Sequence, residues 1–120
     1  MRKSKYLKHI ETFESFENKE NNILKEIEKL FEDYSIYKET LIELELYDSE
    51  GDIENAIEWG ELTFGSLMER IKWFLEDKFN DYDVEVSGYN QNVEKMNIKL
   101  INKKEKDEVI DFELTTSLFD

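Results

Sequence analysis

Four acidic residues that alternate along residues 48–54 are the first side chains whose spacing could bind a metal ion. They are Asp48, Glu50, Asp52 and Glu54. Ca²⁺ prefers oxygen ligands, but the EF-hand loop also requires a glycine at its sixth position and a glutamate at its twelfth. Counted from Asp48, Gly51 is fourth and Trp59 is twelfth. The pattern does not match, so we expect weak adventitious binding of divalent cations and no dedicated metal site.

The remaining residue types offer little for catalysis. His9 is the only histidine and cysteine is absent, so neither a His-based triad nor a zinc site can be assembled. The 4 glycines form no phosphate-binding loop. The 30 acidic residues guarantee chance pairs of carboxylates, and no spacing singles out two of them as a general acid and a general base. We therefore expect no enzymatic activity, no catalytic residue and no cofactor.

The negative charge is concentrated in one stretch of the chain. The 30 acidic and 16 basic residues give a formal net charge of −14. Residues 39–69 contain ten acidic residues and no lysine or arginine, whereas the two signs balance over residues 1–38. These ten residues, the acidic block, are Glu39, Glu43, Glu45, Asp48, Glu50, Asp52, Glu54, Glu58, Glu61 and Glu69. Such a block repels itself and attracts basic surfaces.

This charge distribution disfavours several classes of partner. Binding of nucleic acid needs clustered lysine and arginine, which the acidic block lacks, and an anionic membrane surface is disfavoured for the same reason. No apolar run follows the basic start of the chain, and no stretch is long enough to span a membrane. We expect a cytoplasmic protein. The abundance of lysine, asparagine and isoleucine is typical of AT-rich coding and hints at a bacterial or phage source.

Helical periodicity runs through the first two thirds of the chain. Apolar residues at steps of three and four predict a short helix at residues 4–17 and long helices at residues 22–46 and 53–79. Residues 42–46 also alternate with period two and could form a strand, but the longer pattern favours a helical end. The helical part of the predicted fold therefore covers about residues 4–79.

A turn at residues 48–52 separates the two long helices, with Asp52 as the expected N-cap of the second. A short turn makes the two helices antiparallel neighbours, so we expect an αα-hairpin. Gly60 and Gly65 weaken the second helix, which leaves open a kink or a split near residues 63–65.

The C-terminal third changes to a period of two, which is typical of strands. Apolar and polar residues alternate around residues 84–86, 96–100 and 110–114, and turn-rich links separate these runs. We expect a three-stranded antiparallel β-meander at about residues 83–115, with Lys95 and Lys99 across from Asp111 and Glu113. The predicted fold is a single α+β domain over residues 1–120, with the helices packed on one face of the sheet.

Two tryptophans lie near the acidic residues in a helical projection of residues 53–79. Glu54, Glu58, Glu61 and Glu69 fall on one arc, and Trp59 and Trp73 fall on another. Either the tryptophans edge a protein-binding surface, as aromatic residues do at binding hot spots, or they are buried between the preceding helix and the sheet. The candidate partner-binding residues are Glu39, Glu43, Asp48, Glu50, Asp52, Glu54, Glu58, Trp59, Glu61 and Trp73.

In charge, size and lack of catalytic residues, the chain resembles small acidic inhibitors from the conflict between bacteria and phages. These are anti-CRISPR proteins, DNA mimics and immunity proteins that neutralise nuclease toxins. The resemblance implies a stoichiometric inhibitor that occupies the basic groove of a nucleic-acid-binding effector or a toxin. The alternative is an acidic chaperone or assembly subunit that acts through an oligomer interface, such as that of a homodimer.

Overall fold

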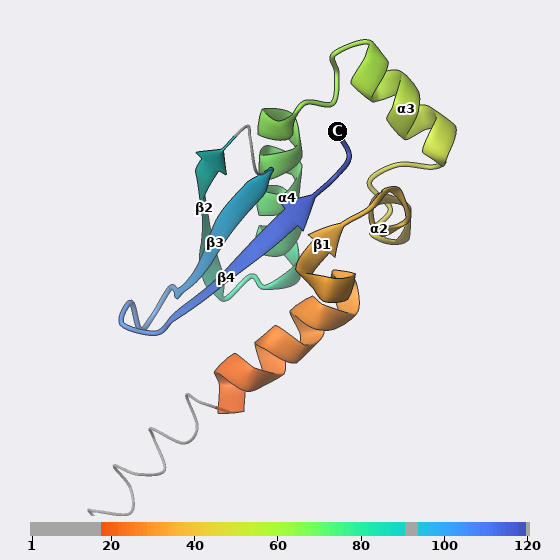
Figure 1. Cartoon of the computed structure of the whole chain (residues 1–120). Coiled ribbons are helices and arrows are strands. Elements are labelled where there is room, and N and C mark those ends of the chain that lie inside the picture. The colour runs from red at the N-terminus through yellow and green to blue at the C-terminus, as the bar shows by residue number, and fades with distance from the viewer. Residues whose placement is uncertain (1–17, 91–93, 120) are drawn as a thin grey trace, which may run out of the picture.

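The computed structural model describes residues 18–90 and 94–119 of the chain (Figure 1). Within them, an N-terminal helix at residues 18–30 precedes the 3₁₀ turn η1 (Glu32–Tyr34) and the short strand β1 (Ser35–Ile36). Three helices follow, which are α2 (Lys38–Glu43), α3 (Glu50–Glu58) and α4 (Phe64–Lys78). The chain ends in β2 (Tyr82–Asn90), β3 (Lys95–Asn102) and β4 (Val109–Thr116). The helix predicted at residues 4–17 lies outside the described residues.

The sheet is mixed and has four strands in the order β1-β4-β3-β2. The last three strands are antiparallel neighbours, but β1 pairs with β4 in parallel, with Ser35 opposite Thr115. The two hydroxyl oxygens of this pair are 2.9 Å apart, and the hydroxyl of Thr116 donates to the carbonyl of Ile36. The prediction of a three-stranded antiparallel meander is therefore wrong. A strand of two residues is too short to show a period, and it lies inside a stretch with helical spacing.

The long helix predicted at residues 22–46 is also wrong. Asp33 and Tyr34 adopt left-handed backbone angles, with φ of 56° and 52°, and Tyr37 is extended. The first helix therefore stops, the chain forms η1 and β1, and a new helix begins at Lys38. α2 ends at Glu43 with Leu44 as its C-cap, and residues 44–46 form a turn, so residues 42–46 contain a helical end and no strand.

The apolar spacing that suggested one helix comes from separate elements, each of which buries its own residue. Phe31 and Leu41 are fully buried and Tyr34 is half-buried, but Phe31 directly follows the first helix, Tyr34 ends η1 and Leu41 belongs to α2. Packing against the same core produced spacings of three and seven residues, as on one face of a helix, although no single helix connects the three positions. The spacing of apolar residues indicates which residues are buried, but it does not by itself indicate which helix or strand each of them belongs to.

The second long helix is split in two at residues 59–63, so the predicted αα-hairpin of long helices does not form. α3 ends at Glu58 with Trp59 as its C-cap, Gly60 follows with a φ of 76°, and the amide of Glu61 donates to the carbonyl of Ala56 over 2.8 Å. α4 begins with a capping box, in which the backbone amides of Thr63 and Ser66 each donate to the hydroxyl of the other residue. The alternative of a split near residues 63–65 therefore describes the chain better than a continuous helix.

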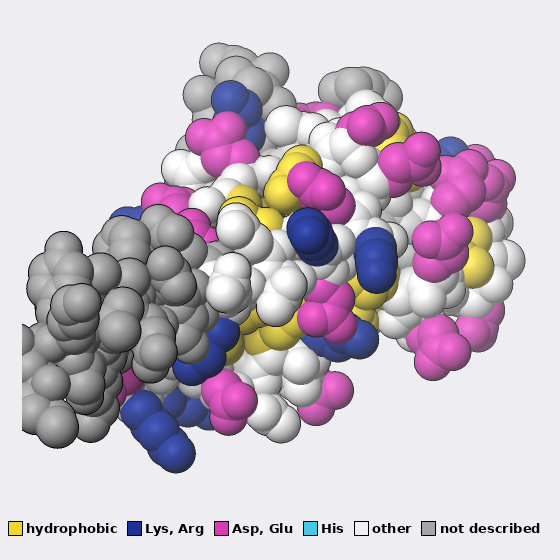
Figure 2. All heavy atoms as spheres, turned by 90° about the horizontal axis from the view of Figure 1, so that it is seen from below, with side chains coloured by type: hydrophobic (Ala, Val, Ile, Leu, Met, Phe, Trp, Pro, Cys, Tyr) yellow, Lys and Arg dark blue, Asp and Glu magenta, His cyan; other side chains and the backbone are white. Residues whose placement is uncertain are grey.

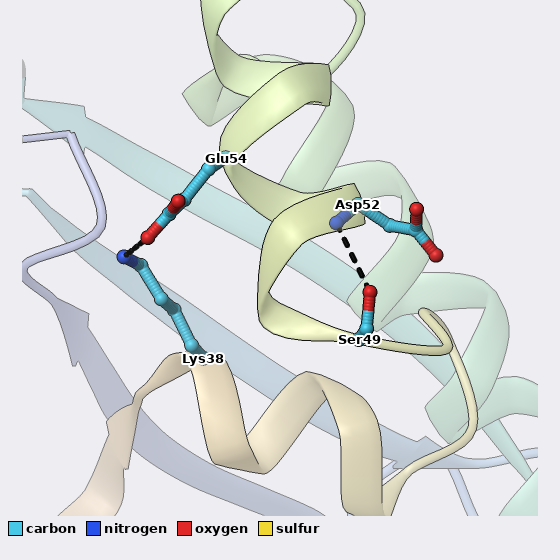
Figure 3. A network of polar contacts seen from close by, with 4 residues as sticks. All are labelled: Lys38, Ser49, Asp52 and Glu54. Atoms are coloured by element: carbon cyan, nitrogen blue, oxygen red, sulfur yellow. Dashed lines mark hydrogen bonds and ion pairs between the residues drawn. The ribbon is translucent and has the colours of Figure 1, made fainter.

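The N-cap of α3 is Ser49, not Asp52 as predicted. The Ser49 hydroxyl accepts from the backbone amide of Asp52 over 3.2 Å, as Figure 3 shows. Asp52 is therefore the third residue of the helix, where the positive end of the helix dipole stabilises its carboxylate.

Figure 1 shows α4 along one face of the sheet, and these elements contribute most of the buried apolar side chains of the core. α4 buries Leu67, Ile71 and Leu75, and the sheet contributes side chains such as Ile98 and Leu114. Figure 1 places α2 and α3 beyond the β1 edge of this sheet, as a separate end of the molecule. In the part of the chain that the structure describes, no helix is long and apolar enough to cross a membrane.

Candidate protein-binding surface

All ten carboxylates of the acidic block are exposed. They come from α2, from the loops on either side of α3, from α3 itself and from the first half of α4. Figure 2 shows acidic side chains gathered at the end of the molecule that α2 and α3 form, while most lysine and arginine side chains in this view lie elsewhere. We call this end the acidic end, and it consists of α2, α3 and the loop after each of them, which carry the acidic residues from Glu39 to Glu61.

The local fold explains why these side chains face outward. α3 turns Ile53 and Ala56 inward, where they are buried together with Leu41 of α2 and Leu62. Thr40 is also buried, and Ile42 and Ile57 pack partly buried against the same core, so the exposed positions of α2 and α3 are mostly occupied by acidic residues. Burial of a few apolar side chains therefore fixes the direction of the carboxylates as well.

One lysine compensates part of this charge. The ammonium of Lys38 is 2.8 Å from a carboxylate oxygen of Glu54 (Figure 3), and no other ion pair within the described residues involves the acidic block. The hydrogen bond to Glu54 raises the pKa of Lys38, against an opposing effect of desolvation. The charges of Glu50 and Glu39 raise this pKa further, which indicates that their negative potentials overlap at Lys38.

The two tryptophans are exposed, so the reading in which they are buried is wrong. Trp59 is 70% exposed and Trp73 is 60% exposed. Trp59 is the C-cap of α3, with Glu58 before it in the chain and Glu61 shortly after it. Trp73 lies on α4, and no ring contact joins it to Trp59 in the described part of the chain. The acidic end therefore includes Trp59, whereas Trp73 belongs to a different element.

Tyr47 has a structural partner. This half-buried side chain lies in the loop between α2 and α3, and the guanidinium of Arg70 is 4.9 Å from the centre of its ring. Such a cation–π contact ties the loop to α4. Tyr47 is thus engaged within the molecule, and Trp59 is the more exposed aromatic side chain at the acidic end.

The structure places the predicted surface residues as follows. Glu39 and Glu43 lie on α2, and Asp48 lies in the loop before α3. Glu50, Asp52, Glu54 and Glu58 lie on α3, and Trp59 and Glu61 follow that helix. Trp73 is the one residue of the predicted set that lies on α4.

Lys38 is a site residue that the sequence did not indicate. It directly precedes the acidic block, and its partner Glu54 is sixteen residues away in the chain. No local spacing rule connects the two residues, because their contact depends on how α2 packs against α3.

Comparison with family models, with curated proteins and with solved structures gave no match. Among the described residues, no three histidine, aspartate or glutamate side chains are placed to hold a metal ion together.

Proposed function

We propose that this chain is a stoichiometric inhibitor that binds a basic protein through its acidic end, and that the partner is a nucleic-acid-binding effector or a nuclease. The observation that supports the proposal is the exposure of all ten carboxylates of the acidic block, of which only Glu54 forms an ion pair with another described residue. Ordinary exposed helices intersperse both signs of charge, because like charges next to each other destabilise the fold. A surface that tolerates this cost gains attraction for a cationic partner.

In this mechanism the carboxylates take the place of nucleic-acid phosphates on the basic groove of the partner. Long-range attraction raises the association rate and makes it sensitive to salt. Trp59 then supplies an apolar contact that slows dissociation, as aromatic residues do at the centres of interfaces. The exposed fraction of Trp59, 70%, leaves most of its ring available for burial against a partner.

Three immobilised proteins test this proposal: the wild type, the triple variant Asp48→Lys/Glu58→Lys/Glu61→Lys, and the control Asp83→Lys/Glu85→Lys/Asp111→Lys. The control makes the same change of charge on exposed strand positions far from α3 in the sequence. We expect the wild type and the control to retain a nucleic-acid enzyme from the native host lysate, to release it in high salt and to inhibit it at equimolar ratio. The acidic-end variant should lose both retention and inhibition.

Two outcomes would count against the proposal. If the acidic-end variant inhibits the captured enzyme as well as the wild type does, this surface has no role in binding. If both triple variants fail equally, total charge matters and the location of the charge does not. Circular dichroism of each variant establishes that the fold is intact.

The exposure of Trp73 supports a second candidate function, that of an assembly or chaperone subunit. Trp73 lies on α4, outside the acidic end, and 60% of its surface is exposed. Tryptophan is enriched at protein interfaces relative to the rest of the protein surface. Light scattering after size exclusion, at low and high salt, separates the two functions. An oligomer that persists in high salt and dissociates in Trp73→Ala supports the subunit, whereas a monomer under both conditions supports the inhibitor.

A further inference from the structure

A groove of about 550 Å³ lies between three segments of the chain, none of which belongs to α2 or α3. These are the first helix, the turn from α4 into β2, and the turn that follows β3, which Figure 1 shows at one end of the sheet. The volume is within the range of small-molecule sites in proteins. We call this feature the lysine groove, because Lys19, Lys78, Lys103 and Lys104 line it.

The charge of the lysine groove is opposite to that of the rest of the molecule. Its four lysines face two acidic residues, Glu26 and Asp81, so the lining has a net charge of 4 − 2 = +2. Only Lys78 is engaged, by Glu26 at 3.7 Å. The other three ammonium groups have no ion pair within the described residues. On a protein with a net charge of −14, this is a local concentration of free cations.

Backbone contacts hold two of these lysines at the rim. The amide of Lys103 donates to the carbonyl of Asp81 over 3.0 Å, which joins the turn after β3 to the turn before β2. The side-chain oxygen of Asn102 accepts from the amide of Lys104 over 2.9 Å, and its side-chain nitrogen donates to Glu108. The Lys103 and Lys104 backbones are therefore fixed before any ligand arrives, which lowers the entropy that binding must offset.

The wall of the groove is apolar. Phe79 and Tyr82 are almost fully buried, and Ile23 of the first helix is half-buried beside them. Burial and the nearby charges of Glu108 and Asp81 raise the pKa of Tyr82, so its phenol stays neutral. A flat apolar ligand group can pack against such a wall, and the exposed amides of Asn22 and Asn80 can supply hydrogen bonds.

We propose that the lysine groove binds a phosphate-bearing organic anion of the size of a nucleotide. Lysine ammonium groups bind phosphate as point charges, and several of them favour a multiply charged group over a single carboxylate. The apolar wall accommodates the organic part. The site is independent of the acidic end, because it uses none of the residues of the acidic block.

Titration of ¹⁵N-labelled full-length protein with ATP tests the proposal, with adenosine and inorganic phosphate as matched ligands. We expect saturable chemical-shift changes at Ile23, at residues 79–82 and at residues 103–104 with ATP, and weaker affinity for either part alone. Lys103→Gln/Lys104→Gln should lower the affinity for ATP roughly threefold to tenfold, the range of two exposed charge contacts. The charge-matched control Lys25→Gln/Lys99→Gln changes exposed lysines outside the lining and should leave it unchanged.

Glu26→Gln provides a test with the opposite sign. It removes the carboxylate that engages Lys78 and lowers the negative charge in the groove, so the affinity for ATP should rise. Absence of saturable shifts, equal affinity for adenosine or for inorganic phosphate, or an equal effect of the two double lysine variants would each overturn the proposal. Tighter binding of a DNA or RNA oligonucleotide than of ATP at the same residues would also overturn it, in favour of a nucleic-acid site.

Discussion

The acidic end and the α4–sheet body of this molecule differ in how positive and negative side chains are distributed. The body intersperses both signs of charge, and its ion pairs include Lys95–Glu113 at 3.4 Å and Lys72–Glu76 at 3.8 Å. At the acidic end the carboxylates from Glu39 to Glu61 are all exposed, and within the described residues Lys38–Glu54 is their one ion pair. The requirements of folding account for the first arrangement but not for the second, because uncompensated like charges lower the stability of the folded state. This difference is the main physical reason to propose that the acidic end binds a partner.

The two regions also differ in how they are packed, and core truncations should reveal the largest effect. Ile98 of β3 and Ile53 of α3 are both fully buried, but α2 and α3 contact each other more than either of them contacts any single strand. We expect Ile98→Ala to lower the free energy of unfolding by about 2–5 kcal/mol, measured by urea denaturation. We expect Ile53→Ala to raise native-state hydrogen exchange mainly in α2 and α3. Equal acceleration of exchange throughout the molecule in both variants would show that the two regions unfold as one unit.

The end of α3 provides the next largest effect. Gly60 has a φ of 76°, and a Cβ atom added to it meets no atom within 4 Å. The cost of Gly60→Ala is therefore backbone strain alone, about 1–2 kcal/mol. A decrease in the urea midpoint with an unchanged slope would confirm this cost. Gly51→Ala, at a helical position with no close contact, is the matched control and should not destabilise the protein.

The end of α2 has the same geometry with a less suitable residue. Glu45 has a φ of 62°, and the amide of Leu46 donates to the carbonyl of Leu41 over 2.9 Å, which is the hydrogen bond of a Schellman motif. We expect Glu45→Gly to raise the free energy of unfolding by about 0.5–1 kcal/mol, because glycine adopts this backbone conformation without strain. Glu45→Gln removes the charge and keeps the strain. If Gln stabilises the protein as much as Gly does, charge repulsion and not backbone strain limits stability at this position.

The end of α3 and the end of the first helix show which helix boundaries the sequence can predict and which it cannot. Gly60 and the Thr63–Ser66 capping box are local signals for a break, and a prediction that weighted them above apolar spacing would have split the helix correctly. No comparable signal marks the end of the first helix, since Asp33 and Tyr34 adopt left-handed angles without being glycine. β1 forms because Ser35 and Ile36 meet β4 about eighty residues later, a contact that local pattern cannot encode.

The candidate site divides in the same way. Exposure of the carboxylates could be predicted, because charged side chains are rarely buried without partners. Exposure of Trp59 could not be predicted. A continuous helix at residues 53–79 would pack against the preceding helix on one side and against the sheet on another, and either contact could bury the tryptophan. Once the helix ends at Glu58, Trp59 becomes a C-cap at the surface. The error in the helix boundary therefore produced the uncertainty about the tryptophan.

The smallest effect is expected within α3, where repulsion between acidic side chains lowers the stability of the fold. Glu58 lies in the last turn, four residues after Glu54, so both the helix dipole and a like charge disfavour it. Glu50 lies in the first turn, four residues before Glu54, where the dipole favours its charge. We expect Glu58→Gln to raise the free energy of unfolding by about 0.3–1 kcal/mol in low salt, and Glu50→Gln to raise it less or to lower it. Urea denaturation in low and high salt measures both changes, which should shrink as salt screens the charges. Equal stabilisation by the two variants would mean that net charge alone, and not the position of each carboxylate on α3, determines the cost of the acidic end.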